Sequence, residues 1–434
     1  MKKYDIEKLN GKEVENLCKR PAIDFESVFE IVRDVLKDVG KNRDEAVLKY
    51  TEKFDGVKLQ SFEVTKEEIK DACGKIPPPT KEAFQLAAKN IEKFHKASAP
   101  KAVETETSKG VKCSSQYRGI EKVGLYVPGG TAPLPSTVLM LGIPARLAGC
   151  EEIIMCTPPN KEGRVPDIIL YAAKLAGITK IFKIGGAQAV ASMGYGTETV
   201  PKVYKIFGPG NQYVTAAKML LSIEPDGAAM DMPAGPSEVL VIADESAKAE
   251  FVAADLLSQA EHGVDSQVVL LCTSDEKTEE ILEEVRKQLA KLSRAEIVEK
   301  CLENSFVLKA PTIKEAMNFS DKYAPEHLII NTETAAQDAE KVQNAGSVFI
   351  GQYSPESAGD YASGTNHTLP TYGYARNYSG ISVMDFMKKI TFQELSEEGV
   401  LNLGEAVEIM AEVEGLDAHK NAMTVRLKSL NNKQ

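Results

Sequence analysis

Residues able to bind a metal ion meet at the end of one predicted helix. Gln259 and His262 stand three positions apart in the run SQAEHG, and Gly263 then favours a helix stop. Because residues three apart share a helix face, both side chains would point the same way. Such a pair is also common on ordinary helix surfaces. Further ligands from elsewhere in the chain are needed for a metal site.

The C-terminal half supplies candidate ligands. Asp360 and His367 lie in the Gly/Ser/Pro-rich stretch 354–371, which has the length of a functional or disordered loop. His419 follows much later in EGLDAH, where Asp417 would equally serve as a helix cap. Nitrogen and oxygen ligands without a thiolate suit zinc with an open position, or manganese or cobalt in its place. The candidate ligand set is Gln259, His262, Asp360 and His419.

An acid and a base stand side by side in the run YAPEHL. Glu326 and His327 follow a proline at the start of a predicted strand. In a regular strand they would face opposite sides of the sheet, so a shared role requires irregular backbone. A general-base pair and a salt bridge at the strand entrance both remain open as interpretations.

Three glycine-bearing turns follow predicted strands and precede predicted helices: YVPGGTAPLPS from Tyr126, IGGAQA from Ile184 and FGPGNQY from Phe207. Turns of this kind present backbone N–H groups where the pyrophosphate of a dinucleotide binds. Gln188 and Asn211 add amide side chains at two helix entrances. None of the turns has GxGxxG with an acidic residue about twenty positions on. Nucleotide binding and plain strand–helix loops therefore both remain open.

Alternating strand and helix patterns must position these groups. They run through residues 126–236 and resume at Ser237, which predicts doubly wound, mainly parallel sheets in two incomplete Rossmann-like α/β domains. The predicted divisions are a small N-terminal segment 1–25, an α/β domain of 26–125 with 237–381 carrying the metal and catalytic residues, a nucleotide-binding α/β domain 126–236, and a mostly helical segment 382–434.

Composition narrows the class of protein. The chain has 434 residues, with 52 Lys and Arg against 63 Asp and Glu, and a formal net charge of -11. This balance argues against nucleic acid or a membrane surface as partner, and no apolar run is long enough to span a bilayer. The seven cysteines form no CxxC pair, which fits a reducing, cytoplasmic location. Among the five histidines, His95 is expected on a solvated helix surface.

Longer motifs resemble the histidinol dehydrogenase family over nearly the whole chain. The blocks that carry the resemblance, in order, are IGGAQAVASMGYGT, KIFGPGNQYVTAAK, DMPAGPSEVLVIAD, DLLSQAEHG, YAPEHL and AGDYASGTNHTLPT. The resemblance implies NAD-dependent oxidation of L-histidinol to L-histidine through bound L-histidinaldehyde, the last steps of histidine biosynthesis. It also implies one zinc ion per subunit and two NAD per turnover.

The same resemblance implies a role for individual residues. The implied catalytic pair is Glu326 and His327, and the implied NAD contacts are Tyr126, Gln188 and Asn211. The implied zinc ligands are Gln259, His262, Asp360 and His419, which also bind histidinol together with Ser237, His327 and Glu414. The implied assembly is a homodimer formed through the C-terminal segment, with His419 and Glu414 donated across the interface. His367 lies in a matching motif without a definite role.

Alternative chemistries remain open. A thiolate of Cys113 or Cys150 would support oxidation through a thiohemiacetal, although neither has a histidine nearby in the sequence and we expect both to be incidental. Glutamate, histidine and zinc would also serve a metal-dependent hydrolase. A nucleotide-binding protein without catalytic activity is the third alternative.

Overall fold

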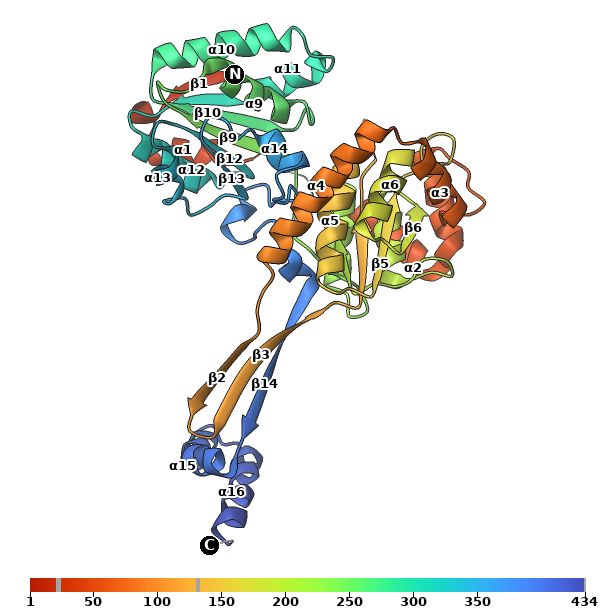
Figure 1. Ribbon diagram of the computed structural model, residues 1–434, viewed down its shortest axis with the longest axis vertical. Helices are drawn as coiled ribbons and strands as arrows, with labels where there is room; N and C mark the ends of the chain where they lie inside the picture. Colours follow the sequence, from red (N-terminus) through yellow and green to blue (C-terminus); the bar gives the residue numbers. More distant parts are fainter. Residues whose placement is uncertain (21–24, 130–132, 433–434) are drawn as a thin grey trace. The chain divides into compact units, whose positions relative to one another are not determined.

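The computed structural model describes residues 1–20, 25–129 and 133–432 (Figure 1). The centre of the first glycine-bearing turn, residues 130–132, lies outside the described residues, as does the end of the predicted N-terminal segment. Within the described residues, no helix is both long enough and apolar enough to cross a membrane.

The chain divides into two compact units. The larger unit comprises residues 1–98 and 120–386, and the smaller unit comprises residues 99–119 and 387–434. The larger unit contains two parallel sheets, so the α/β class predicted from the alternating patterns is confirmed.

One parallel sheet of the larger unit has apolar strands that are buried on both faces. Val239 and Val241 face one layer of helices, whereas Leu240 and Ile242 face the other layer. This burial explains the continuous apolar runs of its central strands. Its strands in spatial order are β1 (Lys2–Asp5), β11 (Phe306–Lys309), β10 (Gln267–Cys272), β9 (Glu238–Ala243), β12 (His327–Asn331) and β13 (Ser347–Ile350). Helices α9 (Ala249–Ala260), α10 (Asp275–Leu289) and α11 (Ala295–Glu303) cover one face, and α1 (Gly11–Leu17), α12 (Ile313–Tyr323) and α13 (Ala335–Ala339) the other.

The N-terminal segment is part of this sheet. Strand β1 pairs with β11 in parallel, from Lys2 opposite Phe306 to Asp5 opposite Lys309. The following helix α1 packs the half-buried side chains of Val14 and Leu17 against the sheet. The first residues therefore extend the edge of a sheet whose other strands lie more than two hundred positions later.

The second parallel sheet of the larger unit has five strands. Their spatial order is β6 (Lys180–Lys183), β5 (Glu152–Thr157), β4 (Lys122–Tyr126), β7 (Lys205–Phe207) and β8 (Ala229–Met230). The connecting helices are α5 (Pro135–Leu147), α6 (Asp167–Ala176), α7 (Gly186–Tyr195) and α8 (Gln212–Ser222). Strands β5 and β6 are added on one side of β4, and β7 and β8 on the other, so the strand order reverses between β4 and β7. Sheets of this kind commonly bind ligands in the crevice at that point.

The N-terminal helices pack differently from the predicted grouping, which joined residues 26–125 to 237–381. Valines of α2, including Val28, Val32 and Val35, share a core with α7 and α8. The helices concerned are α2 (Phe25–Asp55), α3 (Lys66–Lys75) and α4 (Pro78–Ala97), and all three lie beside the five-stranded sheet (Figure 1). An amphipathic pattern shows that one helix face is buried, but it does not identify the surface that covers it.

The smaller unit is an antiparallel sheet followed by a pair of helices. Strand β3 lies between its two neighbours, and β14 pairs with it from Met387 opposite Gly119 to Leu395 opposite Val111. The elements are β2 (Val103–Ser108), β3 (Val111–Gly119), β14 (Met387–Leu395), α15 (Glu397–Val413) and α16 (Asp417–Asn431). The strands β2 and β3, which the predicted grouping placed in an α/β domain, thus belong to the C-terminal unit.

The turn after β7 is fixed by a close backbone approach. Gly208 has a φ of 121°, and a Cβ atom there would lie 2.0 Å from the backbone oxygen of Tyr126. Its N–H donates to Asp231 Oδ2 at 2.8 Å, and its carbonyl accepts from the buried Lys218 ammonium at 2.8 Å. Lys218 also pairs with Asp231 at 2.5 Å. The turn is thereby held against the end of β4.

Gly208→Ala should lower the free energy of unfolding by about 3 kcal/mol, because the new methyl group adds a steric clash to left-handed backbone strain. Gly149→Ala is the matched control, since Gly149 has a φ of 80° and open space around its Cα. It should cost only about 1 kcal/mol. Urea denaturation measures both, and equal losses would show that the contact with Tyr126 is unimportant.

Candidate functional site

A cavity of about 350 Å³ in the larger unit collects most of the predicted catalytic and metal-binding residues. Gly208 and Pro128 line it from the carboxyl edge of the five-stranded sheet. The six-stranded sheet contributes residues near the amino ends of β9 and β12 and near the end of α9. The predicted site residues on its wall are Ser237, His262, Glu326, His327 and Asp360. The six-stranded sheet thus faces the cavity with the amino ends of its strands, whereas parallel sheets usually bind ligands at the carboxyl ends.

A single residue of β9 holds the adjacent acid and base. The backbone N–H of Glu238 donates to Glu326 Oε2 at 2.8 Å, and the backbone oxygen of Glu238 lies 3.2 Å from His327 Nδ1. Regular strand begins only at His327, after a left-handed Ala324 with a φ of 51°. This irregular entrance lets both buried side chains reach one cavity, with Glu326 Oε2 lying 3.6 Å from His327 Nδ1.

Carboxylates surround the imidazole of His327. Glu356 Oε1 lies 3.9 Å from Nδ1, and Asp360 Oδ1 lies 3.6 Å from Nε2. Burial disfavours the charged imidazole, but Glu356, Glu326 and Asp360 outweigh it and raise the pKa of His327 to about 10. Burial also raises the pKa values of Glu326 and Glu356 to about 8. Within the described residues, no lysine or arginine lines the cavity or forms a salt bridge with Glu326, Glu356 or Asp360, so these three acids have no fixed cation.

The same cluster has the chemistry of a metal site. Ligand atoms of His262, Glu356 and Asp360 all lie within 4.8 Å of one another. Gln259 is fully buried on α9, and neither of its amide atoms has a hydrogen-bond partner in the described part of the chain. Burial lowers the pKa of His262, which keeps its imidazole neutral and able to bind a metal. These donors fit zinc, and a bound ion would satisfy the otherwise unpaired amide oxygen.

Sequence reasoning missed Glu356. Helix α14 (Glu356–Tyr361) places Glu356 and Asp360 four positions apart on one face, so both acids reach the cluster. This spacing was readable in SPESAGDY, but the surrounding glycine and serine residues favoured a loop. A short helix inside a polar segment has no hydrophobic pattern that would reveal it.

The remaining predicted ligands belong to the smaller unit. Glu414 ends α15 and His419 lies on α16, and both side chains are exposed. The larger unit therefore brings His262 and Asp360 together, with Gln259 buried on α9 three positions before His262, but it does not contain the fourth predicted ligand. The contribution of Glu414 and His419 to the site stays a prediction.

His367 connects helix α14, at Asp360, to α5. Its Nδ1 donates to the backbone oxygen of Asp360 at 2.8 Å, and its Nε2 lies 3.0 Å from the hydroxyl of Thr137. With Nδ1 as donor, Nε2 accepts from that hydroxyl. His367 therefore secures the backbone of a predicted metal ligand.

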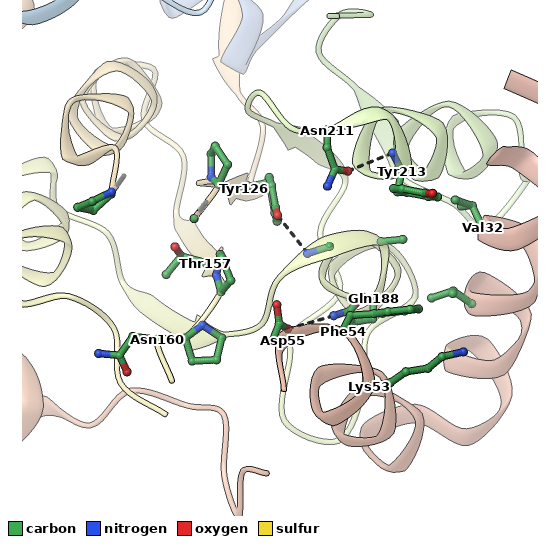
Figure 2. A pocket seen from close by; sticks show the side chains of 18 of the residues that line it. Val32, Lys53, Phe54, Asp55, Tyr126, Thr157, Asn160, Gln188, Asn211 and Tyr213 are labelled. Carbon is green, nitrogen blue, oxygen red and sulfur yellow. Dashed lines mark hydrogen bonds between the residues drawn. The ribbon is translucent and has the colours of Figure 1, made fainter. Parts of the chain in front are cut away.

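A larger cavity of about 1250 Å³ contains the three predicted NAD contacts (Figure 2). The hydroxyl of Tyr126 accepts the N–H of Gly186 at the start of α7 at 3.0 Å. Asn211 caps α8 by accepting from the backbone N–H groups of Tyr213 and Val214. Gln188 also lines the cavity. Pro128 lines both this cavity and the smaller one, so the two adjoin.

The predicted solvent exposure of His95 is wrong. Its side chain is buried, and neither ring nitrogen has a hydrogen-bond partner among the described residues. Burial lowers its pKa to about 4. The flanking charged residues in EKFHKAS suggested a solvated position, but on a helix these neighbours point to other sides.

Neither cysteine of the thiolate alternative has the surroundings of a reactive thiol in the larger unit's candidate site. Burial raises the pKa of Cys150 to about 12, which disfavours a reactive thiolate. Cys113 lies on β3 in the smaller unit. Neither cysteine lines the cavity of Glu326 and His327.

A buried ion pair anchors the residue that holds this acid and base. Arg20 Nε lies 2.7 Å from Glu238 Oε2, and Arg20 Nη2 lies 2.8 Å from Oε1. The guanidinium stacks 3.5 Å from the ring centroid of Tyr323, whose hydroxyl donates to Gln267. Both charged side chains are almost completely buried. The bidentate geometry fixes the start of β9 from a residue 218 positions earlier in the chain.

Two parallel sheets and an acid and a base buried together beside a larger cavity define an α/β protein with a candidate active site, and the similar proteins place it in the oxidoreductase class. The family model for histidinol dehydrogenase matches residues 18–427. The chain therefore belongs to the histidinol dehydrogenase family.

Individual relatives agree with this membership. The chain is 58% identical over 414 residues to the histidinol dehydrogenase of Bacteroides thetaiotaomicron, covering 95% of this chain and 96% of the relative. It is 53% identical over 435 residues to the chloroplastic enzyme of Arabidopsis thaliana, covering 100% and 93%. The crystal structure of histidinol dehydrogenase from Elizabethkingia anophelis superposes with a TM-score of 0.96 at 51% identity, covering 99% of each chain.

Arg20→Met should lower the free energy of unfolding by about 3–5 kcal/mol, because it leaves the Glu238 carboxylate buried without its partner. The double variant Arg20→Met/Glu238→Leu should regain much of this loss. The control Arg146→Met breaks the exposed pair with Glu92 and should cost less than about 1 kcal/mol. Urea denaturation compares the variants; a double variant as unstable as the sum of its single changes would contradict a coupled pair.

Proposed function

We propose that this protein catalyses the NAD-dependent, four-electron oxidation of L-histidinol to L-histidine through bound L-histidinaldehyde, with zinc assistance. Membership of the family supports the substrate and the place in histidine biosynthesis. The observation that carries the chemical proposal is the cluster of His262, Asp360, Glu326 and His327 on one cavity wall, together with a buried Gln259 amide, three positions before His262 on the chain, that has no hydrogen-bond partner in the described residues.

Gln259, His262 and Asp360 are the residues of the larger unit that we propose hold zinc. In the proposed homodimer, His419 and Glu414 are donated across the interface, and Ser237 contacts the substrate. When bound, zinc would orient the amine and imidazole nitrogens of histidinol, and its charge would offset the carboxylates around His327. Glu356 lies close enough to Asp360 and His262 to adjust the charge of the same site.

His327 is the proposed base for both oxidations. With Nδ1 donating to the Glu238 carbonyl, the lone pair of the neutral imidazole is on Nε2, which has no hydrogen-bond partner in the described residues. Nε2 accepts the hydroxyl proton of histidinol as the carbinol hydride leaves for NAD. The same atom later accepts a proton from the aldehyde hydrate as a second hydride leaves.

Glu326 is the proposed base for hydration of the aldehyde. Its carboxylate is fixed by the N–H of Glu238, and its burial raises the pKa to about 8. A carboxylate with a raised pKa is a stronger base than an exposed one, so it removes a proton from water more readily. The small cavity keeps the aldehyde between the two residues through both oxidations, which prevents its loss.

The larger cavity is the proposed NAD site, with Tyr126, Gln188 and Asn211 as contacts. Gln188 in the first turn of α7 and Asn211 at the amino end of α8 line it (Figure 2), so the positive ends of two helix dipoles would favour a diphosphate there. Because this cavity adjoins the smaller one, a dinucleotide can place its nicotinamide beside the histidinol carbinol.

NADH absorbance should report two NADH per L-histidinol consumed, because each oxidation transfers one hydride. Removal of the metal by a chelator should abolish turnover, and zinc should restore it. The metal content of the chelated protein is measured alongside the rate. One NADH per substrate, or full turnover by metal-free protein, would contradict the proposal, and a hydrolase would form no NADH.

His327→Asn should lower kcat by about 10²–10⁴-fold, because the proposed base is removed while the side chain stays similar in size. Zinc content and the histidinol KM should change little. Steady-state kinetics with metal analysis measures all three quantities. An unchanged kcat in a zinc-loaded variant would exclude His327 as the base.

A further inference from the structure

The larger cavity contains an acid to which no role has been given. Asp55 is the last residue of α2 and is the one acidic side chain among the described residues that line this cavity. Its Oδ2 accepts from Gln188 Nε2 at 3.4 Å (Figure 2). No salt bridge joins it to a basic side chain within the described residues. Burial raises its pKa to about 6, as expected for a carboxylate that has lost water without gaining a cation.

The position of Asp55 is close to the turn that would receive a nucleotide. A Cβ atom at Gly185 would lie 3.0 Å from Asp55 Oδ1 and 2.7 Å from Pro158. The carboxylate therefore packs against the backbone that leads into α7. Gln188 is buried beside it, and its Oε1 has no hydrogen-bond partner in the described residues. Asp55 and Gln188 thus each have a side-chain oxygen that can accept a further hydrogen bond.

The sheet itself lacks an acid at the usual place. In common dinucleotide sites, an acid at the end of the second strand of the unit binds the ribose hydroxyls of NAD. The corresponding strand here is β5, which lies next to the first strand, β4. It ends at Thr157 and is followed by Pro158, Pro159 and Asn160; all four residues line the same cavity, and none is an acid.

We propose that Asp55 supplies this missing acid by accepting hydrogen bonds from the adenosine ribose hydroxyls, and that it thereby selects NAD over NADP. The inference rests on the proposed NAD site. A 2′-phosphate would meet the negative charge of Asp55. No arginine lines the described part of the cavity, and its one lysine, Lys53, lies 5.2 Å from the ring centroid of Phe54. A phosphate therefore lacks the arginine that usually accommodates it.

Steady-state kinetics of the zinc-loaded enzyme with NAD and with NADP tests the inference. Asp55→Asn should raise the NAD KM about tenfold, because hydrogen bonds to a charged acceptor become weaker ones to an amide. The ratio of kcat/KM for NAD to that for NADP should fall about tenfold or more, with the histidinol KM unchanged. The control Asp34→Asn removes the same charge from an exposed position of α2 outside the cavity and should change neither quantity.

An equal loss with NAD and NADP would overturn the inference and would assign Asp55 to holding Gln188. An unchanged ratio in folded Asp55→Asn, or in Asp55→Ser if the first variant is unstable, would also overturn it. Gln188→Ala and Asn211→Ala separate this failure from that of the NAD site. If they raise the NAD KM while Asp55→Asn does not, only the inference fails; if none of the three does, the proposed NAD site fails as well.

Discussion

The arrangement of the candidate site depends on the hydrogen bonds of one backbone residue, Glu238. Its N–H holds Glu326 and its carbonyl faces His327, so the acid and the base keep their places only while the start of β9 keeps its own. The side chain of Glu238 is in turn fixed by the buried guanidinium of Arg20. The N-terminal segment is therefore a structural support of the site as well as the edge of its sheet.

Electrostatics gives this arrangement its second constraint. Burying several carboxylates around one imidazole is unfavourable unless positive charge compensates them, and none of the described residues on the cavity wall supplies a fixed cation. An unpaired amide at Gln259 adds a further cost. The proposed divalent cation would offset both unfavourable terms. It would also permit the neutral imidazole that proton transfer from a substrate requires.

Local patterns in the sequence were sufficient to predict the parallel sheets. They also marked the short motifs whose residues line the cavities. Apolar strands such as QVVLLC predict burial on both faces, and residues of the turns after Tyr126 and Phe207, for which nucleotide binding was one of two open interpretations, line the larger cavity. Contacts between residues that are far apart in the sequence had no such local signal. Nothing near Arg20 points to Glu238, and the valines of α2 do not reveal whether α7 or another helix covers them. The burial of His95 and the place of Glu356 in the site were missed for a related reason, because polar neighbours along the chain say little about neighbours in space.

Zinc coordination by the buried cluster is the central claim, and anomalous X-ray diffraction at the zinc edge tests it most directly. Crystals of the zinc-loaded protein with L-histidinol should show an anomalous peak about 2.0–2.2 Å from Gln259 Oε1, a ring nitrogen of His262 and a carboxylate oxygen of Asp360. A fully occupied zinc peak elsewhere, with the amide of Gln259 still unliganded, would contradict the account.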